Sequence, residues 1–268
     1  MDIQTQGRVL ILAGSDSSGG AGVQADIKTV TALGGYAATA ITALTVQNTL
    51  GVQFATRVHP DLIVAQAQAV LEDIGADAFK TGMLGGRKAV EAVADVLDGS
   101  PDIPAVIDPV MAAKGGHALL SAKALSALKA RLVPRADLLT PNALEAEDLT
   151  GIVVGDLDGQ RRAAAALMEA GARAVLLKGG HIPGKTVIDL LLTGSGETLL
   201  EGSRIDTPHT HGTGCTLASA CATGLAQGMG LEAAVARAWA YTAEAIRRAP
   251  GFGQGHGPID HGWPLRRE

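Results

Sequence analysis

The residue types best suited to chemistry stand at positions 212–215, where the sequence reads Gly-Thr-Gly-Cys. Gly212 and Gly214 lack a Cβ atom, so the backbone can turn sharply there and a ligand can come close to it. The small residues that follow predict a helix, whose first N–H groups have no partner within the helix. These amides lie at the positive end of the helix dipole, which favours phosphate. We therefore expect residues 212–215, Thr213 among them, to form an anion-binding loop.

Cys215 adds a reactive group to this loop. A thiol in the first turn of a helix has a lowered pKa, so we expect a thiolate that can accept a proton. An anion pocket with a proton acceptor inside it indicates phosphoryl transfer. The pattern also allows a simpler interpretation, because Gly-x-Gly is common at loop–helix junctions and small residues also serve close helix packing. Cys221 is expected to be a small core residue.

Apolar runs of strand length alternate with helical patterns along the chain, as in a parallel sheet that helices cover on both faces. Strands are predicted at 8–13, 37–47, 105–110, 137–140 and 174–178, with a strand and its turn at 78–84 and a hairpin of 186–193 and 198–205. Helices are predicted at 23–33, 60–74, 87–97, 121–132, 142–149, 159–170 and 231–248, besides the one after the anion-binding loop. No linker or repeat interrupts this order, so we expect one α/β domain over residues 1–268.

Polar side chains follow several predicted strands. Gln47, Asp108 and Lys178 each stand where a strand is expected to end, and Asn142 follows another. In open parallel sheets, ligands bind beyond the carboxyl ends of the strands. These side chains should therefore gather at one edge of the sheet, where Lys178 would place positive charge beside bound phosphates.

The stretch 179–186 matches the P-loop pattern G-x-x-x-x-G-K-[ST] and follows a predicted strand. A P-loop must open a helix, since helix amides hold the phosphates. Residues 187–193 instead have strand composition and no helix cap. We therefore interpret the match as accidental and Lys185 as a solvated loop lysine.

Composition argues against several classes of partner. Aromatic residues make up 3% of the chain and the formal net charge is −5, so a nucleic-acid surface is not expected. No apolar run reaches the ~18 residues of a membrane span. Cys215 and Cys221 would lie ~9 Å apart along one helix, too far for a disulfide. Reduced cysteines favour a cytoplasmic protein.

Histidines near the anion-binding loop keep open roles. His209 and His211 flank the loop, where contact with nucleotide phosphates is one interpretation. Two histidines at this spacing do not share a helix face and no third ligand is near in the sequence, so we expect no zinc site. The glycine-rich tail at 251–257, with His256, either lines a nucleotide pocket or wraps the edge of the sheet.

Eight short blocks in one order carry a family resemblance that spans nearly the whole chain. The sequence resembles the ribokinase-like superfamily and, within it, the hydroxymethylpyrimidine/phosphomethylpyrimidine kinases of thiamine biosynthesis. The blocks are 13–28 (AGSDSSGGAGVQADIK), 41–48 (ITALTVQN), 80–84 (KTGML), 108–111 (DPVM), 140–146 (Thr-Pro-Asn, then Glu-Ala), 177–181 (LKGGH), 209–216 (HTHGTGCT) and 255–258 (GHGP). Sugar and nucleoside kinases of the superfamily usually carry Asp where this chain, like the pyrimidine kinases, has Cys215.

The resemblance implies a ribokinase-like three-layer sandwich, a central and mostly parallel sheet with helices on both faces. It also implies a kinase that moves the γ-phosphoryl group of ATP, with Mg²⁺, onto the hydroxymethyl group of 4-amino-5-hydroxymethyl-2-methylpyrimidine. The family then phosphorylates the monophosphate to the diphosphate. Partners of such a kinase are small molecules, and the likeness suggests a homo-oligomer, a dimer.

Roles for single residues follow from the same resemblance. Gln47 matches the residue that holds the pyrimidine, and its amide can both donate to and accept from an aminopyrimidine. Asp26, Met83 and Val110 match walls or orienting groups of the substrate pocket. From the residues alone, Met83 and Val110 fit an ordinary core equally well, and Asp26 fits a first-turn acid favoured by the helix dipole.

Phosphoryl transfer needs positioning and charge neutralisation more than covalent help. The amides of the anion-binding loop would hold the developing charge, and Cys215 would act as general base for the substrate hydroxyl. Alternatively, the thiol is incidental and the amides suffice. Asp108, Asn142 and Glu145 would lie beside the ATP phosphates, with Asp108 and Glu145 as ligands of Mg²⁺ through waters. The spacing puts Asn142 and Glu145 on one helix face.

Two other functions stay open. The nearer one is a pyridoxal or pyridoxine kinase, whose substrates also carry a hydroxymethyl group on an aromatic ring. Gln47 and Cys215 favour the pyrimidine without excluding the pyridine. The other is a non-catalytic module that binds a nucleotide or a thiamine precursor. Retention of Lys178, Asp108 and Glu145 argues against it.

Overall fold

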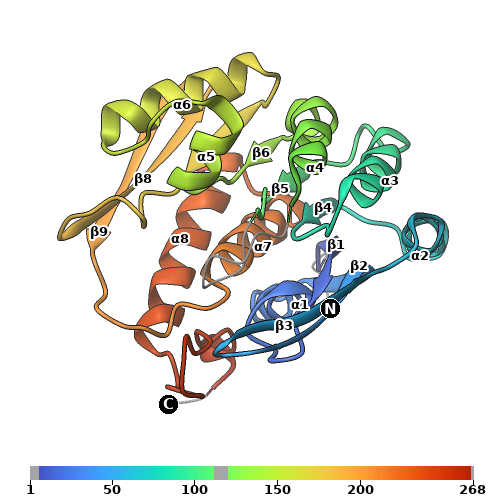
Figure 1. Cartoon of the computed structure of the whole chain (residues 1–268), viewed down its shortest axis with the longest axis horizontal. Helices are drawn as coiled ribbons and strands as arrows, with labels where there is room; N and C mark the ends of the chain where they lie inside the picture. Colours follow the sequence, from blue (N-terminus) through green and yellow to red (C-terminus); the bar gives the residue numbers. More distant parts are fainter. Residues whose placement is uncertain (1–5, 112–119, 267–268) are drawn as a thin grey trace, which may run out of the picture.

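Nine strands form one hydrogen-bonded sheet in the computed structural model, which describes residues 6–111 and 120–266 (Figure 1). Their order is β3-β2-β1-β4-β5-β6-β7-β8-β9. Neighbours from β2 to β7 run parallel, whereas β3, β8 and β9 are joined antiparallel at the two ends. The strands are β1 Arg8–Ser15, β2 Tyr36–Asn48, β3 Gly51–Arg57, β4 Ala78–Thr81, β5 Ala105–Ile107, β6 Leu138–Leu139, β7 Ala174–Leu177, β8 Thr186–Thr193 and β9 Gly196–Ser203.

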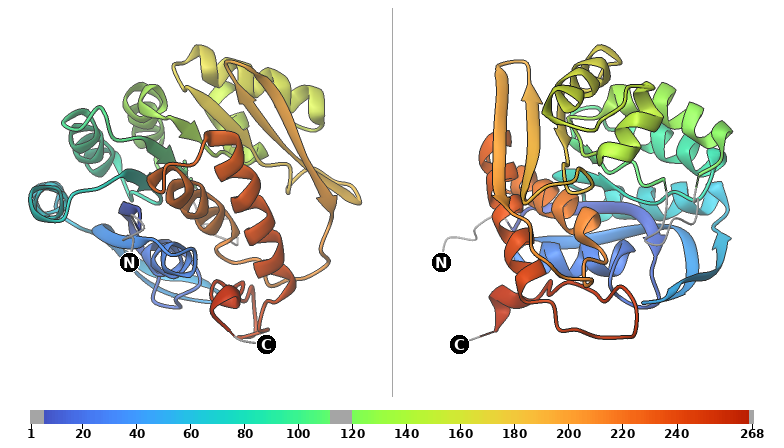
Figure 2. Two further views of the ribbon diagram at one scale, coloured as in Figure 1. Left: turned by 180° about the vertical axis from the view of Figure 1, so that it is seen from behind. Right: turned by 60° about the vertical axis from the view of Figure 1, so that its left-hand side comes forward.

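Helices cover both faces of this sheet, so the molecule has three layers (Figures 1 and 2). Helices α1, α7 and α8 pack on one face, and α2 to α6 pack on the other. The helices are α1 Gly22–Ala32, α2 Pro60–Asp73, α3 Arg87–Asp98, α4 Ala122–Ala127, α5 Ala143–Thr150, α6 Leu157–Glu169, α7 Thr213–Ala226 and α8 Leu231–Arg247. The α/β sandwich expected from the sequence is confirmed. Among the described residues, no helix has both the length and the apolar character needed to cross a bilayer.

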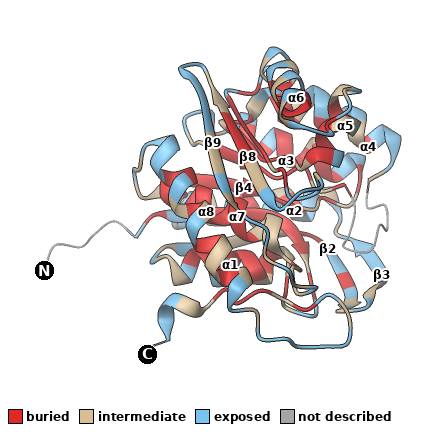
Figure 3. Ribbon diagram, turned by 90° about the vertical axis from the view of Figure 1, so that its left-hand side faces the viewer, coloured by how far each residue is buried: buried red, intermediate tan, exposed pale blue. Residues whose placement is uncertain are grey.

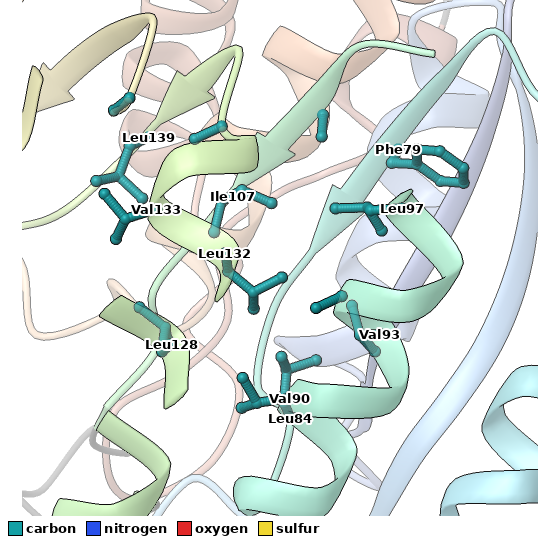
Figure 4. Packing of buried hydrophobic residues seen from close by; sticks show 14 of the residues in the cluster. Phe79, Leu84, Val90, Val93, Leu97, Ile107, Leu128, Leu132, Val133 and Leu139 are labelled. Atoms are coloured by element: carbon teal, nitrogen blue, oxygen red, sulfur yellow. The ribbon is translucent and has the colours of Figure 1, made fainter. Parts of the chain in front are cut away.

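Strand β1 shows why the strands read as continuous apolar runs. Leu10 and Leu12 enter the core beneath α2 to α6, while Val9 and Ile11 enter the core beneath α1, α7 and α8. All four side chains are fully buried. Figure 3 shows the central strands as a buried layer, and Figure 4 shows the first core between α3 and strands β4 and β5. Both faces need apolar side chains, so no alternation appears in the sequence.

Strand β3 was not predicted from the sequence. Five of its seven side chains are exposed, so no apolar run marks it, and it is held by antiparallel pairing with β2 at the edge of the sheet. Strand β4 ends at Thr81, before the segment predicted as its turn, and strand β5 ends at Ile107, sooner than predicted. The segments 82–84 and 108–110 leave the sheet beyond the strand ends, where Met83, Asp108 and Val110 line a cavity.

The helix predicted over 121–132 is α-helical only as far as Ala127. It continues as a π-helical turn, Leu128–Leu132, which buries both of its terminal leucines in the core. Its predicted N-cap is confirmed, because the Ser121 hydroxyl accepts a hydrogen bond from Ala124 N. The wider turn therefore changes the helix type without changing where the segment packs.

Candidate active site

A cavity of about 800 Å³ opens at the carboxyl ends of the parallel strands. Its wall includes the start of α7 and the segments that follow β1, β4, β5, β6 and β7. All but one of the expected site residues line it; they are Gln47, Met83, Asp108, Val110, Asn142, Glu145, Lys178, Gly212, Thr213, Gly214 and Cys215. The exception is Asp26.

The anion-binding loop ends in the N-cap of α7. Gly212 has φ = 85°, a left-handed conformation that favours glycine, and a Cβ there would collide with the Gly20 carbonyl. A Cβ on Gly214 would stand 3.3 Å from Lys178 Nζ. Thr216 N donates to Gly212 O at 2.9 Å, the first bond within the helix. The two amides before it therefore have no acceptor in the helix and lie at the cavity wall.

A lysine between two carboxylates lies beside this loop. Lys178 Nζ is 3.2 Å from Asp108 Oδ1 and 4.0 Å from Glu145 Oε2. Burial acts to lower the pKa of Lys178, but the charges of Asp108 and Glu145 outweigh it, so the pKa is raised. Thr140 Oγ1 donates to the same Asp108 oxygen at 3.3 Å. Lys178 thus stays an ammonium and keeps positive charge next to the amides of α7.

Asn142 and Glu145 form a capping box at the start of α5. Asn142 Oδ1 accepts from Glu145 N at 3.0 Å, and Glu145 Oε2 accepts from Asn142 N at 2.8 Å. The expectation that both residues stand on one helix face is corrected for Asn142, because it is the N-cap of α5 and its side chain is bonded to the backbone of Glu145. Burial raises the pKa of Glu145 to about 7, with Lys178 opposing the shift and Asp108 adding to it.

The carboxylates suit a magnesium ion that arrives on phosphates, not one enclosed by protein. In the described ranges, no group of three His, Cys, Asp or Glu side chains could hold a metal. Asp108 Oδ1 is held by Lys178, whereas its Oδ2 lies 3.7 Å from the point where a Cβ of Gly214 would stand. Mg²⁺ keeps several waters and uses one or two carboxylates together with substrate phosphates. Asp108 and Glu145 fit that donor set.

Cys215 does not have the lowered pKa that its place in the first helical turn predicted. Burial raises the pKa of its thiol to about 12, Lys80 opposes the shift, and Asp26 and Asp108 add to it. The residue keeps part of its surface on the cavity, but the helix start is set so deep that lost solvation outweighs the helix dipole. The ligand-free protein therefore carries a protonated thiol. Cys221 is buried, as expected of a core residue.

Asp26 lies beneath the cavity and not on its wall. Lys80 Nζ donates to both of its carboxylate oxygens at 2.8 Å, and Ser219 Oγ donates to Oδ1 at 2.7 Å. Of the two roles expected for Asp26, wall or orienting group of the substrate pocket, the wall is excluded, because its carboxylate is fully buried and faces the Lys80 ammonium. Ser219 stands one turn after Cys215 on α7, on the same helix face. The Lys80–Asp26 pair thus supports the helix that carries the thiol.

Met83 and Val110 are half-buried and line the cavity. A Cβ on Gly14 would stand 2.5 Å from Met83 Cε, so the methionine is closely packed against the end of β1. Of the two interpretations left open by the sequence, cavity wall describes their position better than closed core.

Gln47 and His211 form a polar corner of the same cavity. Gln47 Nε2 lies 3.3 Å from His211 Nε2, which lies 2.7 Å from Asp16 Oδ2. Asp16 and His211 are buried, and both line the cavity. From the sequence, the role of His211 stayed open and Asp16 had no assigned role. Their signal in the sequence was membership of the blocks 13–28 and 209–216.

Comparison with known proteins agrees with this geometry. The family profile described as phosphomethylpyrimidine kinase matches residues 16–260. The chain belongs to the phosphomethylpyrimidine kinase family. It is 50% identical over 257 residues to the hydroxymethylpyrimidine/phosphomethylpyrimidine kinase of Streptomyces coelicolor, which covers 96% of this chain and 95% of that one. The chain is therefore a kinase.

Two further similarities place this kinase among its relatives. It is 50% identical over 256 residues to the thiamine biosynthesis bifunctional protein ThiED of Geobacter sulfurreducens, covering 96% of this chain and 52% of that protein. Among solved structures, the ADP complex of Bacillus subtilis pyridoxal kinase superposes with a TM-score of 0.89 at 36% identity. That match covers 96% of this chain and 97% of the other.

The cavity of this kinase continues past the anion-binding loop toward β8, β9 and α8. Asp189 accepts from Gly179 N at 2.7 Å and from Trp239 Nε1 at 3.1 Å, which ties β8 to α8. A Cβ on Gly202 would stand 2.8 Å from the Trp239 ring. These residues were not predicted as site residues, because they come from separate elements and no sequence motif includes them.

The P-loop match at 179–186 leads into strand β8 and not into a helix, so the interpretation as an accidental match is confirmed. Lys185 is exposed, as expected. The glycine-rich tail touches both the cavity and the edge of the sheet. His256 lines the cavity, and its backbone N–H donates to Thr49 O at 2.8 Å, at the turn between β2 and β3.

Proposed function

We propose that this kinase transfers the γ-phosphoryl group of ATP to the hydroxymethyl group of 4-amino-5-hydroxymethyl-2-methylpyrimidine, and then phosphorylates the monophosphate to the diphosphate in thiamine biosynthesis. One observation carries the proposal. A single cavity holds an amide at Gln47 and, farther along, the start of α7 beside Lys178, in a chain 50% identical to a kinase of that name. One sheet carries all of these residues, which supports a single kinase domain over the whole chain.

The proposed mechanism rests on fixed positive charge. The amides of Gly214 and Cys215, with Thr213 and Gly212 before them, hold the transferring phosphoryl group at the positive end of α7. Lys178 neutralises the phosphates from the other side. A Mg²⁺ ion bound to ATP would neutralise further charge, and Asp108 and Glu145 would hold it through waters. Asn142 contributes by capping α5, which positions Glu145.

Cys215 is the proposed acceptor of the substrate's hydroxyl proton. Its thiol stands in the same turn as the anion-binding amides, where the attacking oxygen must come. The raised pKa means that the thiol must first lose its own proton, so the reactive form is a minor one at neutral pH. If the thiol is incidental, the amides and Lys178 alone carry the reaction.

The substrate ring is proposed to lie against Met83 and Val110, with the Gln47 amide on its polar edge. An aminopyrimidine presents an amine donor beside a ring-nitrogen acceptor, and an amide matches both. Asp26 is proposed to act indirectly, by supporting helix α7 beneath the cavity together with Lys80. The nucleotide is proposed to extend toward β8, β9 and α8, along the remaining wall of the cavity.

A homodimer is proposed from the outer face of the β2–β3 hairpin. Leu44, Val46 and Phe54 are 47%, 50% and 61% exposed, and Val46 is paired with Phe54 across the strands. An apolar patch of this kind marks an interface with another protein surface. Phe54→Glu is expected to shift the mass measured by light scattering from dimer to monomer.

A cytoplasmic location is proposed from the use of ATP and from two unpaired cysteines.

The deciding experiment compares ATP- and Mg²⁺-dependent turnover of hydroxymethylpyrimidine, its monophosphate and pyridoxal side by side. Turnover of both pyrimidines, with pyridoxal poor, is expected. Gln47→Ala should weaken binding of the pyrimidine and so raise its KM, while the KM for ATP stays the same. An unchanged pyrimidine KM would remove Gln47 from the site, and tight binding of both ligands without turnover would favour a binding module.

The second candidate is phosphorylation of pyridoxal. The observation that favours it is the similarity to a solved pyridoxal kinase in complex with ADP. The structural match covers 96% of this chain. Turnover of pyridoxal alone in the same experiment would assign the protein to vitamin B6 salvage.

A further inference from the structure

Asp16 can only accept hydrogen bonds in this fold. Its Oδ1 accepts from Ser18 N at 2.8 Å, and its Oδ2 accepts from Ala21 N at 2.8 Å. Ser18 Oγ lies 2.8 and 2.9 Å from the two oxygens. Burial acts to raise the pKa of Asp16, but the hydrogen bonds from His211 and Ser18 lower it below its ordinary value. The carboxylate is therefore ionised, and His211 Nε2, at 2.7 Å, must carry the proton that it donates.

This proton creates a conflict with the neighbouring amide. In the orientation that the structure gives to Gln47, its Nε2 lies 3.3 Å from the same His211 Nε2. Both atoms then carry hydrogens, so neither can accept from the other. The nitrogen and oxygen of a side-chain amide are nearly alike in size, so the hydrogen-bonding neighbours decide which end faces which side.

Thr45 creates a second conflict at the other atom of the amide. Its Oγ1 lies 2.9 Å from Ser15 O and 3.3 Å from Gln47 Oε1. The Ser15 carbonyl can only accept, so the single hydroxyl proton of Thr45 goes there. Thr45 Oγ1 then has lone pairs left for Gln47, but no proton. An amide oxygen at this position would face another acceptor.

Turning the amide end for end removes both conflicts. Gln47 Oε1 then accepts from His211 Nε2–H, and Gln47 Nε2 donates to Thr45 Oγ1. The two ends of the amide are thereby fixed by different chains of bonds. One chain runs through His211 to Asp16, and the other runs through Thr45 to Ser15 O.

We propose that His211, oriented by Asp16, and Thr45 together hold the Gln47 amide with its oxygen toward His211 and its nitrogen toward Thr45, and that this orientation selects the substrate ring. The inference rests on the proposed role of Gln47 as the reader of the ring. One N–H and one oxygen lone pair of the amide stay free for a ligand. Their order along the cavity is fixed, so a ring whose donor and acceptor stand in the matching order is preferred over one with the order reversed. His211 is thus a positioning residue for specificity.

The first test asks whether His211 acts through Gln47. His211→Phe is made in the wild-type protein and in a Gln47→Leu background, and KM for hydroxymethylpyrimidine, KM for ATP and kcat are measured. In the wild-type background the pyrimidine KM should rise about tenfold, the value of one oriented hydrogen bond, with the ATP KM unchanged. In the Gln47→Leu background the same change should alter it less than about twofold, because no amide is left to orient. Equal effects in both backgrounds would overturn the proposal.

Two controls keep the outcomes distinct. His59→Phe replaces an exposed histidine that does not line the cavity and should leave all three constants unchanged. Gln47→Leu alone tests the underlying role. If it leaves the pyrimidine KM unchanged, the reading of the ring by Gln47 fails, and the orientation proposal fails with it. If it raises KM but His211→Phe in the wild type does not, only the orientation proposal fails.

A measurement on the unmodified protein does not depend on any variant folding. In ¹⁵N-histidine-labelled protein, the NMR shift of His211 Nε2 should be that of a protonated, pyrrole-type nitrogen. A pyridine-type shift at Nε2 would mean that Asp16 is not its acceptor-only partner, and would overturn the assignment of the amide.

Discussion

Lys80 Nζ lies 2.8 Å from both carboxylate oxygens of Asp26, and neither side chain has any exposed surface. Removing one partner of a buried pair leaves the other charge uncompensated. Lys80→Met is therefore expected to lower the free energy of unfolding by about 3–5 kcal/mol. The double variant Asp26→Asn with Lys80→Met should recover much of this loss. Urea unfolding measures both, with the exposed Lys88→Met as control; a double variant as unstable as the single one would contradict the argument.

Cys215 offers a prediction on pH. Its thiol has a raised pKa of about 12, so the thiolate fraction grows about tenfold for each pH unit between 7 and 9. If the thiolate is the base, kcat should rise with pH over this range. Cys215→Ser should lower kcat about a hundredfold with little change in the pyrimidine KM. Cys221→Ala, a change in the core, should leave kcat as it is. A Cys215→Ser enzyme with full turnover would assign the reaction to the amides alone.

Glu145 has a folded-state pKa of about 7, above the value of ~4.3 for an unperturbed carboxyl group. The folded state therefore binds this proton more tightly than the unfolded state does. The resulting stability is fully present below pH ~4 and is lost as the pH rises through 7. Glu145→Gln mimics the protonated form, so it should stabilise the ligand-free protein at pH 8 by at most about 3 kcal/mol, and by less at pH 5.

Urea unfolding of wild type and Glu145→Gln at pH 5 and pH 8 measures this difference. The exposed Glu169→Gln serves as the matched control and should show the same small effect at both pH values. A Glu145→Gln effect independent of pH would mean that the carboxyl group is ionised throughout the range.

Lys178 and Lys185 form a matched pair, one on the cavity wall and one in the exposed loop of the P-loop match. Lys178→Met should lower kcat by about 10²–10³, the usual effect of losing one group that stabilises transition-state charge. It also leaves Asp108 and Glu145 without the cation between them. Lys185→Met should be silent. Steady-state kinetics with saturating ATP decides, and the opposite ranking would restore the P-loop interpretation.

Most of the fold could be predicted from the sequence, because burial on both faces of the sheet requires a continuous run of apolar residues in each central strand. Val9, Leu10, Ile11 and Leu12 are apolar in succession and lie alternately in the two cores. Strand β3 has no such run, since its partner β2 supplies backbone hydrogen bonds and its own side chains face solvent. Edge strands depend on pairing that sequence pattern does not record.

The position of site residues was predictable where a strand end fixes it, as for Asp108 and Lys178. Their electrostatic state was not. The pKa of Cys215 depends on how deeply α7 is set against the sheet, and the partner of Asp26 depends on β4 passing beneath it. Both are consequences of tertiary packing. The capping box of Asn142 had a sequence signal, Asn followed three residues later by Glu, which also matched a pair of metal ligands.

Helix α7 packs against α1, β1, β4 and β5, all of which precede it in the chain. On a ribosome, the strands therefore emerge long before the helix that covers them. Until residue 226 has left the exit tunnel, the apolar face of Val9, Ile11 and Val106 has no cover from α7. A nascent chain that stalls before Thr213 would thus expose this apolar surface and would also lack the anion-binding loop, so the helix that covers the sheet and the start of the site emerge together.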